Sequence, residues 1–346
     1  MDHAFPSSPP LSGGPGTADA LAAWTASEAV CALVEAFAAD AGDHALARDL
    51  RAGAGFPVER LARLDAFSAR WDTRQGRERD QAGRLDLTPA QISLVHAAAE
   101  ALGMDRAVPP RWHRYDHVLI LGGSIRGCLA RTAYAAHLVR SGRVEAGVVT
   151  ALGGHRPFTG DEPVLAAAAG APGLRDEFRA LDHAARTAFG LGEPERVEGH
   201  AAPAPGAWSV RRYTDAEGRR VRVVAAPAAD PARPRANTAD TYAFFRDRLE
   251  RPGPSHRLLL VTTPINAPAQ HATAVRTLAL PTGCALDTAG VPSAFVPPAL
   301  TRRFTATEYL LEVRSTIRAL RRLAEDIGPP DRGLARPSTS RPQDIA

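Results

Sequence analysis

The sequence contains no lysine, so all 42 of its basic residues are arginine. Without lysine the chain has neither an amine for a Schiff base nor the phosphate-binding side chain of a P-loop. Cysteine is scarce as well: Cys31, Cys128 and Cys284 lie far apart, and their spacing is not that of a metal site. We therefore expect free thiols in a reducing cytoplasm and no bound metal.

Long apolar runs and basic blocks are also missing. No stretch approaches the roughly 20 apolar residues that span a bilayer, and the N-terminus lacks the charged and apolar regions of a secretory signal. The net charge of +4 comes from interspersed arginines and acids, and the 4 Trp, 5 Tyr and 11 Phe residues do not interleave with a basic cluster. These absences argue against a membrane or nucleic-acid partner and predict a cytoplasmic protein; an oligomer is compatible with the sequence.

What is present is an ordinary globular composition, 45% apolar and 23% charged, over 346 residues. This length allows one large domain or two smaller ones with a sizeable core. Prolines and glycines crowd both ends, which predicts a disordered leader and a disordered tail. The expected units are a leader over 1–16, a helical region over 17–114, an α/β domain over 115–328 and a tail over 329–346.

The helical pattern begins at Thr17. Apolar side chains recur at intervals of three and four residues over 30–37, which indicates an amphipathic helix. Further helices are expected over about 57–71 and from Thr88, which a proline follows at the first helical position. Because residues 111–116 join this region to the next without a Gly/Ser linker, we expect the helices to pack on the α/β core and to roof part of its crevice.

From Tyr115 onward, short β-rich apolar runs alternate with amphipathic helices, which predicts a parallel sheet covered by helices on both faces. Strands are expected at about 116–121, 145–151, 257–262 and 284–288, and helices at about 126–141, 175–190, 238–250, 267–279 and 305–324. The two runs that flank Asp215–Gly218 predict a β-hairpin over about 208–224, inserted into the α/β core.

Two Gly-Gly pairs end neighbouring strands of this expected sheet. Gly122 and Gly123 precede Ser124 and a helix, and Gly153 and Gly154 end the second run. Glycine lets the backbone turn with positive φ and lets a ligand approach the main chain, and a helix that starts there presents unpaired N–H groups. We expect the two turns to form a crevice for a phosphate, a carboxylate or the polar edge of a nucleotide; the alternative is a tight turn that binds nothing.

Charged and titratable side chains follow these glycines. Arg126 and Arg131 lie near the start of the helix, where a guanidinium can clamp an anion, although Arg131 could instead pair with a core acid. His155 would face the crevice as a proton donor or acceptor, or would be a loop histidine without a role. Glu177 opens the next helix, where either the helix dipole or a ligand explains an acid. His155 and Glu177 are our candidate catalytic residues.

Polar groups also follow the later strands. The remaining candidate ligand-binding residues are Asn237, Thr238, Thr262, Thr263 and Asn266. Service as a helix N-cap would by itself explain Asn237. His271 and Arg276 follow on the next helix, where His271 is as readily a surface residue as a site residue. Because no Gly-x-Ser-x-Gly, His-Glu-x-x-His or Cys-x-x-Cys motif is present, the sequence indicates a binding crevice more clearly than a nucleophile.

Taken in order, these motifs resemble the SanA/YdcF-like (ElyC-like) domain family. That family has a strand ending in Gly-Gly, an Arg about eight residues later, a second Gly-Gly strand end, a helix-opening acid, an Asn-Thr pair and a Val-Thr-Ser-type strand end. The matching positions here are Gly122-Gly123, Arg131, Gly153-Gly154, Glu177, Asn237-Thr238 and Val261-Thr262-Thr263. The match spans about 115–325. It departs where Asn266 replaces a frequent His, where Ala269 replaces a frequent Arg, and at the inserted hairpin.

The resemblance implies a Rossmann-like α/β fold, and the YdcF-like branch is associated with S-adenosylmethionine binding. S-adenosylmethionine or another nucleotide is therefore the expected cofactor, with group transfer to a small molecule as the expected reaction. In this hypothesis Arg126 or Arg131 clamps the anionic group, Glu177 contacts the polar edge or acts as base, and His155 transfers protons. Two alternatives stay open: a non-catalytic interaction protein that uses the N-terminal helices, and a hydrolase, which needs a metal or an activated nucleophile.

Overall fold

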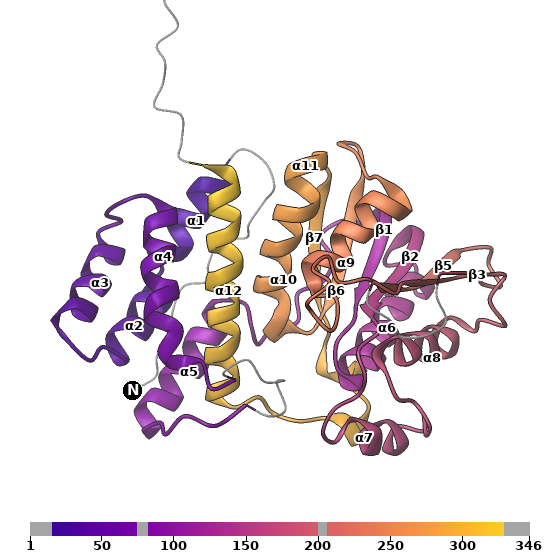
Figure 1. The fold of residues 1–346 in the computed structure, drawn as a ribbon, viewed down its shortest axis with the longest axis horizontal. Coiled ribbons are helices and arrows are strands. Elements are labelled where there is room, and N and C mark those ends of the chain that lie inside the picture. Colours follow the sequence, from indigo (N-terminus) through magenta and orange to yellow (C-terminus); the bar gives the residue numbers. More distant parts are fainter. Residues whose placement is uncertain (1–15, 75–81, 200–205, 329–346) are drawn as a thin grey trace, which may run out of the picture.

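A computed structural model describes residues 16–74, 82–199 and 206–328. All of the predicted tail, and all of the predicted leader except Gly16, lie outside these described residues. Within them, a helical region built from the N-terminal part of the chain stands beside an α/β region. The long helix α12 (Ala306–Ile327) runs between the two (Figure 1).

The described residues form one seven-stranded sheet with the order β3-β4-β5-β2-β1-β6-β7. The strands are β1 (Arg114–Leu121), β2 (Glu145–Gly154), β3 (Arg196–Gly199), β4 (Ser209–Thr214), β5 (Arg220–Ala226), β6 (Arg257–Thr262) and β7 (Ala285–Gly290). Strands β5, β2, β1, β6 and β7 pair in parallel, whereas β3 and β4 are antiparallel additions at one edge. The chain leaves β1 in one direction through β2 and β5, and then returns to β6 on its other side. The switch point of this doubly wound sheet therefore lies between β1 and β6.

Helices of the N-terminal region and of the α/β region differ in how they are connected. The N-terminal ones are α1 (Thr17–Thr25), α2 (Glu28–Ala36), α3 (Ala41–Arg51), α4 (Pro57–Ser68) and α5 (Pro89–Ala101). The α/β region contains α6 (Ile125–Arg140), α7 (Glu162–Ala168), α8 (Glu177–Phe189), α9 (Thr238–Phe244), α10 (Ala267–Ala274) and α11 (Leu280–Thr282). The helices α9 and α10 each continue into a π-helical segment, over Phe245–Glu250 and Val275–Ala279. Only the α/β helices alternate with strands, as the sequence pattern predicted.

The two faces of β1 show why its last four residues, 118–121, are all apolar. Val118 and Ile120 pack with side chains of α6 and α8 in one buried cluster. Leu119 and Leu121 point the other way and pack with α9 and α10 in a second cluster. Successive side chains of a strand alternate between faces, so a strand buried on both sides must be apolar at every position. The predicted parallel sheet with helices on both faces is confirmed.

The helical region packs against the rest of the protein through α12. Side chains of α1 to α5 form one buried cluster with Leu310, Leu320 and other residues of α12, and the cluster continues to Ile265 and Ala272 beside α10. Polar contacts support it: the Tyr309 hydroxyl donates to Asp105 Oδ1 at 2.6 Å. The apolar stripe of these helices is therefore buried within the protein, and α12 belongs to both regions.

Two elements near the crevice differ from the sequence prediction. Strand β2 continues through Gly153 and Gly154, which pair with Ala225 and Ala226 of β5. The second glycine pair is therefore extended strand and not the turn that we expected. The segment after it contains α7, a short helix that the sequence pattern did not indicate. The predicted hairpin is present as β4-β5, and β5 is at the same time a parallel strand beside β2.

Candidate functional site

The ends of β1 and β6 meet at the switch point, where Ile120 and Val261 are register partners. Here Gly123 adopts φ +154°, a conformation that L side chains rarely adopt. Arg131 reaches back from α6 and is buried. Its Nη1 donates to the Leu121 carbonyl at 2.7 Å and also to the Gly122 carbonyl, and its Nε donates to Thr263 Oγ1 at 3.1 Å. Arg131 therefore fixes the backbone of the turn and links it to the end of β6.

Glu177 lies against both glycine pairs. Asp176 caps α8 by accepting from Arg179 N at 2.8 Å, which leaves Glu177 as the first residue of the helix. A Cβ built at Gly122 would overlap Glu177 Oε1, and one at Gly153 would lie 3.1 Å from the same atom. The Glu177 carboxyl therefore excludes a side chain at Gly122, whereas at Gly153 the nearest obstacle to a Cβ is Leu181 Cδ1, at 2.6 Å. Neither has a positive φ.

The surroundings of Glu177 favour its neutral form. Burial raises the pKa of Glu177 to about 7, although the charges of Arg156, Arg235 and Arg131 act in the opposite direction. Arg156 Nε lies 3.6 Å from Glu177 Oε2. A carboxyl that titrates near neutral pH is suited to take up or release a proton.

A buried ion pair fills the start of α6. Arg156 Nη1 and Nη2 donate to the two carboxylate oxygens of Glu162 at 2.7 and 2.9 Å, and Nη2 also donates to the Gly123 carbonyl at 2.8 Å. The same carboxylate accepts the N–H groups of Ile125 and Thr159, each at 3.0 Å. Burial acts to raise the pKa of Glu162, but Arg156 and these N–H groups act more strongly in the opposite direction. The pKa of Glu162 is therefore below its ordinary value.

This arrangement corrects our expectation that the first N–H groups of α6 are unpaired. The N–H of Ile125 is bound by Glu162, which approaches from α7. Sequence reasoning assigned no role to Arg156 or Glu162. Arg156 directly follows the second glycine pair and His155, which was a usable signal. Glu162 is 37 residues from Ile125 in the sequence and had no local signal.

Three other candidate residues have their contacts outside the group formed by Arg131, Glu177 and the glycines. His155 Nε2 hydrogen bonds with Ser209 Oγ of β4 at 3.1 Å, and burial lowers its pKa. Arg126 donates to the Leu300 carbonyl and lies 3.7 Å from Asp161 Oδ2. Ser124 gives α6 no side-chain cap. These contacts place His155 toward β4 and Arg126 toward the segment before α12.

Residues after the later strands have mainly local contacts. Asn237 caps α9 by accepting from Asp240 N at 3.0 Å, with Thr238 as the first helical residue. Thr262 Oγ1 donates to Gln270, and Asn266 is buried at the end of β6. The histidine and arginine that follow on α10 and its continuation turn outward: His271 Nδ1 contacts Thr288 Oγ1 at 2.8 Å, and Arg276 pairs with Asp326. The structure thus brings together Gly122, Gly123, Arg131, Gly153, Glu177 and Thr263.

Comparison with known proteins gives the chain a family. Residues 13–103 match the family described as the Rv3785 N-terminal domain. Over 341 residues, the chain is 31% identical to "Uncharacterized protein Rv3785" of Mycobacterium tuberculosis (strain ATCC 25618 / H37Rv) and to "Uncharacterized protein Mb3814" of Mycobacterium bovis (strain ATCC BAA-935 / AF2122/97). Each alignment covers 89% of this chain and 90% of the relative. The chain belongs to the family of these mycobacterial proteins. No solved structure matches it.

The family match and the fold divide the chain at a similar place. The matched residues 13–103 contain α1 to α5, so the part that the family description treats as a domain is the helical region. The full-length relatives share the α/β region as well. Within the described ranges, no cluster of three or more His, Cys, Asp or Glu side chains could hold a metal ion. No helix in these ranges has the length and apolar character needed to cross a bilayer.

Proposed function

We propose that this protein binds an adenosyl ligand, S-adenosylmethionine or a nucleotide, at the carboxyl ends of β1 and β6. It then transfers a group from that ligand to a small molecule in the cytoplasm. The observation that carries the proposal is Glu177, a buried carboxyl with a pKa raised to about 7 that lies against Gly122 at the switch point. Open α/β sheets bind ligands in this crevice. A group that titrates near neutral pH can take up or release a proton there.

The ion pair of Arg156 and Glu162 supports an anionic ligand. A ligand that carries a carboxylate or a phosphate can replace the Glu162 carboxylate at Arg156 and at the N–H of Ile125. A ligand without an anion that displaced Glu162 would remove the paired carboxylate of the buried Arg156, whose other contacts include the Gly123 carbonyl and Glu177. Breaking a buried ion pair in this way costs about 3–5 kcal/mol. S-adenosylmethionine has a carboxylate and nucleotides have phosphates, so both meet this requirement.

The remaining residues have supporting roles in this proposal. Arg131 is a positioning residue, because it holds the carbonyl groups of Leu121 and Gly122 and so fixes the turn that the ligand approaches. Thr263, which Arg131 contacts, offers a hydroxyl at the end of β6. His155 stays a predicted second proton-transfer group, and burial keeps it neutral to lower pH than an exposed histidine.

Calorimetric titration with S-adenosylmethionine, ATP and AMP at pH 7 tests the proposal. We expect the wild-type protein to bind at least one of the three, and the variant Gly123→Val to bind it at least ten times more weakly. Valine at φ +154° is strained, and its Cβ would lie 3.3 Å from Arg131 Nη1.

Gly142→Val is the matched control, because Gly142 also has a positive φ, +71°, but a Cβ there meets nothing within 4 Å. It lies in the turn between α6 and β2, near the amino-terminal end of β2 and so away from the carboxyl ends of the strands. Circular dichroism establishes that both variants are folded. The proposal is wrong if none of the three probes binds to the wild type, or if Gly123→Val binds as well as Gly142→Val.

A further inference from the structure

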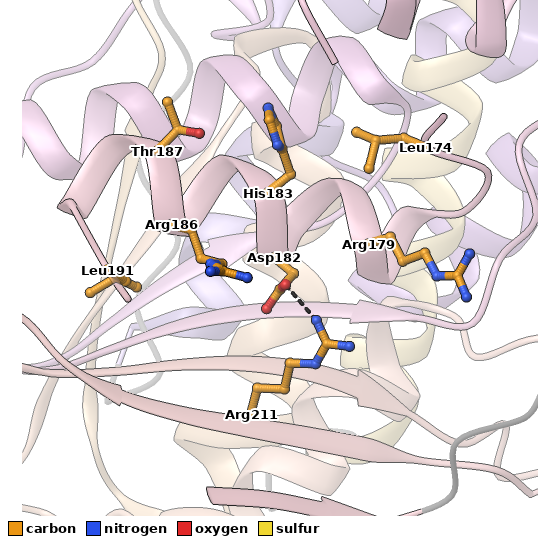
Figure 2. Close-up of a pocket in the computed structure, with 8 residues that line it drawn as sticks. All are labelled: Leu174, Arg179, Asp182, His183, Arg186, Thr187, Leu191 and Arg211. Atoms are coloured by element: carbon orange, nitrogen blue, oxygen red, sulfur yellow. Dashed lines mark hydrogen bonds and ion pairs between the residues drawn. The ribbon is translucent and has the colours of Figure 1, made fainter. Parts of the chain in front are cut away.

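A cavity of about 520 Å³ lies outside the switch-point crevice, between α8 and β4. It is lined by Leu174, Arg179, Asp182, His183, Arg186, Thr187, Leu191 and Arg211 (Figure 2). Five of these side chains recur along one face of α8, whereas Arg211 comes from β4 and faces the helix. None of the residues assigned to the proposed adenosyl site lines this cavity.

The centre of the cavity is a preorganised arginine. Asp182 is the one acidic residue of the lining, and its carboxylate accepts hydrogen bonds from Arg211 and from the Tyr213 hydroxyl. The guanidinium of Arg211 also lies over the ring of Phe178, 5.0 Å from the centroid. Because Asp182 is buried and accepts hydrogen bonds from two donors, it holds Arg211 in place. Its negative charge also acts on Arg186.

The two outer arginines pair with acids of different exposure, 24% for the Asp176 side chain and 82% for the Glu193 side chain. Arg179 lies 3.5 Å from Asp176, and 61% of the Arg179 side chain is exposed. Arg186 pairs with Glu193, whose side chain is 82% exposed. Exposed pairs of this kind contribute little and exchange readily for a better anion. Within the described part of the chain, His183 and Thr187 make no hydrogen bond or ion pair, so both are available to a ligand.

We propose that this cavity is a second ligand site, which binds a phosphorylated small molecule. Arg179, Arg186 and Arg211 offer guanidinium groups to the phosphate, and Leu174 and Leu191, which lie at opposite ends of the lining, offer apolar surface to the organic part (Figure 2). Guanidinium groups bind phosphate through paired, charge-assisted hydrogen bonds. The volume lies within the range of about 300–1,000 Å³ that is typical of small-molecule sites and exceeds what a bare phosphate needs. The site is independent of the adenosyl site proposed above.

Calorimetric titration with inorganic pyrophosphate tests this site. We expect the wild-type protein to bind pyrophosphate, and binding to weaken as sodium chloride is added, because salt screens charges at an open site. The double variant Arg179→Gln/Arg186→Gln removes the two exposed arginines and leaves the Arg211–Asp182 pair intact. It is expected to bind at least ten times more weakly, with an unchanged thermal midpoint.

The double variant Arg48→Gln/Arg143→Gln is the matched control. It removes two exposed arginines from α3 and from the turn before β2, and it lowers the net charge by the same amount. The control is expected to bind pyrophosphate like the wild type. Absence of binding to the wild type overturns the proposal. An equal loss of pyrophosphate affinity in both double variants also overturns it, because it indicates attraction to net charge alone. Unchanged affinity in Arg179→Gln/Arg186→Gln overturns it as well, because it indicates that pyrophosphate binds elsewhere.

Discussion

Glu177 shows how one residue explains several others. Its carboxyl excludes a side chain at Gly122, and together with Leu181 it excludes one at Gly153, although neither glycine has a positive φ. Sequence reasoning identified these residues separately, with the glycines as turn formers. The structure links Gly122 to Glu177, because this glycine makes room for the buried acid. Only Gly123, with φ +154°, has the backbone conformation that the sequence analysis expected of the whole group.

The pKa of Glu177 predicts a pH dependence of stability. The folded-state pKa is raised to about 7 from an ordinary value of 4.5, so the unfolded chain loses its proton first as pH rises. The protonated carboxyl therefore supports the fold fully below pH 4.5, and this contribution is lost as pH rises through 7. Relative to Glu177→Gln, which cannot ionise, the wild type should lose about 3 kcal/mol of unfolding free energy between pH 4.5 and 8.

Urea unfolding of both proteins at several pH values measures this difference. The comparison isolates Glu177, because every other titrating group is present in both. A constant difference in unfolding free energy across this pH range would show that Glu177 titrates normally and would remove the main support for its role in proton transfer.

At the scale of elements, the segment between β2 and α8 packs on the start of α6. It contains α7, whose Glu162 binds Arg156 and the first N–H of α6. The segment is closed at its base by the hydrogen bond from Phe158 N to the Arg175 carbonyl, 2.8 Å long. A helix N-terminus that would otherwise attract an external anion is thus filled by a carboxylate of the same chain.

Removal of Glu162 should destabilise the protein strongly. Glu162→Ala leaves the buried Arg156 without its carboxylate, and we expect a loss of about 3–5 kcal/mol in chemical unfolding. Val164→Ala, in the same helix at a side chain that is 71% exposed, should change the stability by less than about 0.5 kcal/mol.

Added acetate provides a second measurement on the same variant. If the pocket vacated by the Glu162 side chain binds anions, 100 mM acetate should raise the melting temperature of Glu162→Ala more than that of the wild type. Equal shifts in the two proteins would mean that the start of α6 does not bind an external carboxylate, which would also weaken the proposed mode of ligand binding.

At the scale of the whole molecule, α12 makes the helical region and the α/β region one unit. Its side chains share a buried cluster with α1 to α5 and with residues near α10 (Figure 1). The segment between α5 and β1 also contacts the end of β7, where Gly290 N donates to the Val108 carbonyl at 3.1 Å. Whether these helices roof the crevice stays a prediction. Their buried apolar stripe favours a supporting role over that of a free partner surface.

This shared helix predicts a single unfolding transition. Leu320 of α12 is fully buried in the common cluster, so Leu320→Ala should lower the unfolding free energy by about 2–5 kcal/mol in both regions together. In a protein with Trp112→Phe and Trp208→Phe, tryptophan fluorescence reports on the helical region alone, whereas circular dichroism reports on the whole chain. We expect the two signals to share one midpoint, before and after the Leu320 substitution. Two separate midpoints would show that the regions unfold independently.

The sequence by itself determined the elements whose signals are local. The apolar run of β1, the Thr88-Pro89 start of α5, the Asn237 cap of α9 and the hairpin are all as predicted, because each depends on residues within one turn or one strand. The doubly wound parallel sheet followed from the alternation of such elements. Because both residues directly follow predicted parallel strands, the sequence also placed Gly122 and Thr263 at the carboxyl ends of the sheet.

Only the tertiary structure decided which side chains meet there. The length of β2 depends on pairing with β5, which follows it in the chain by more than sixty residues, and this pairing converts Gly153 and Gly154 from a turn into strand. Glu162 reaches α6 across 37 residues, and His155 turns to Ser209 across 54. Local periodicity carries no information about such partners, because their distances are set by how sheet and helices pack. The sequence therefore located the strand ends that meet at the switch point, and the packing of distant elements determined which side chains surround them.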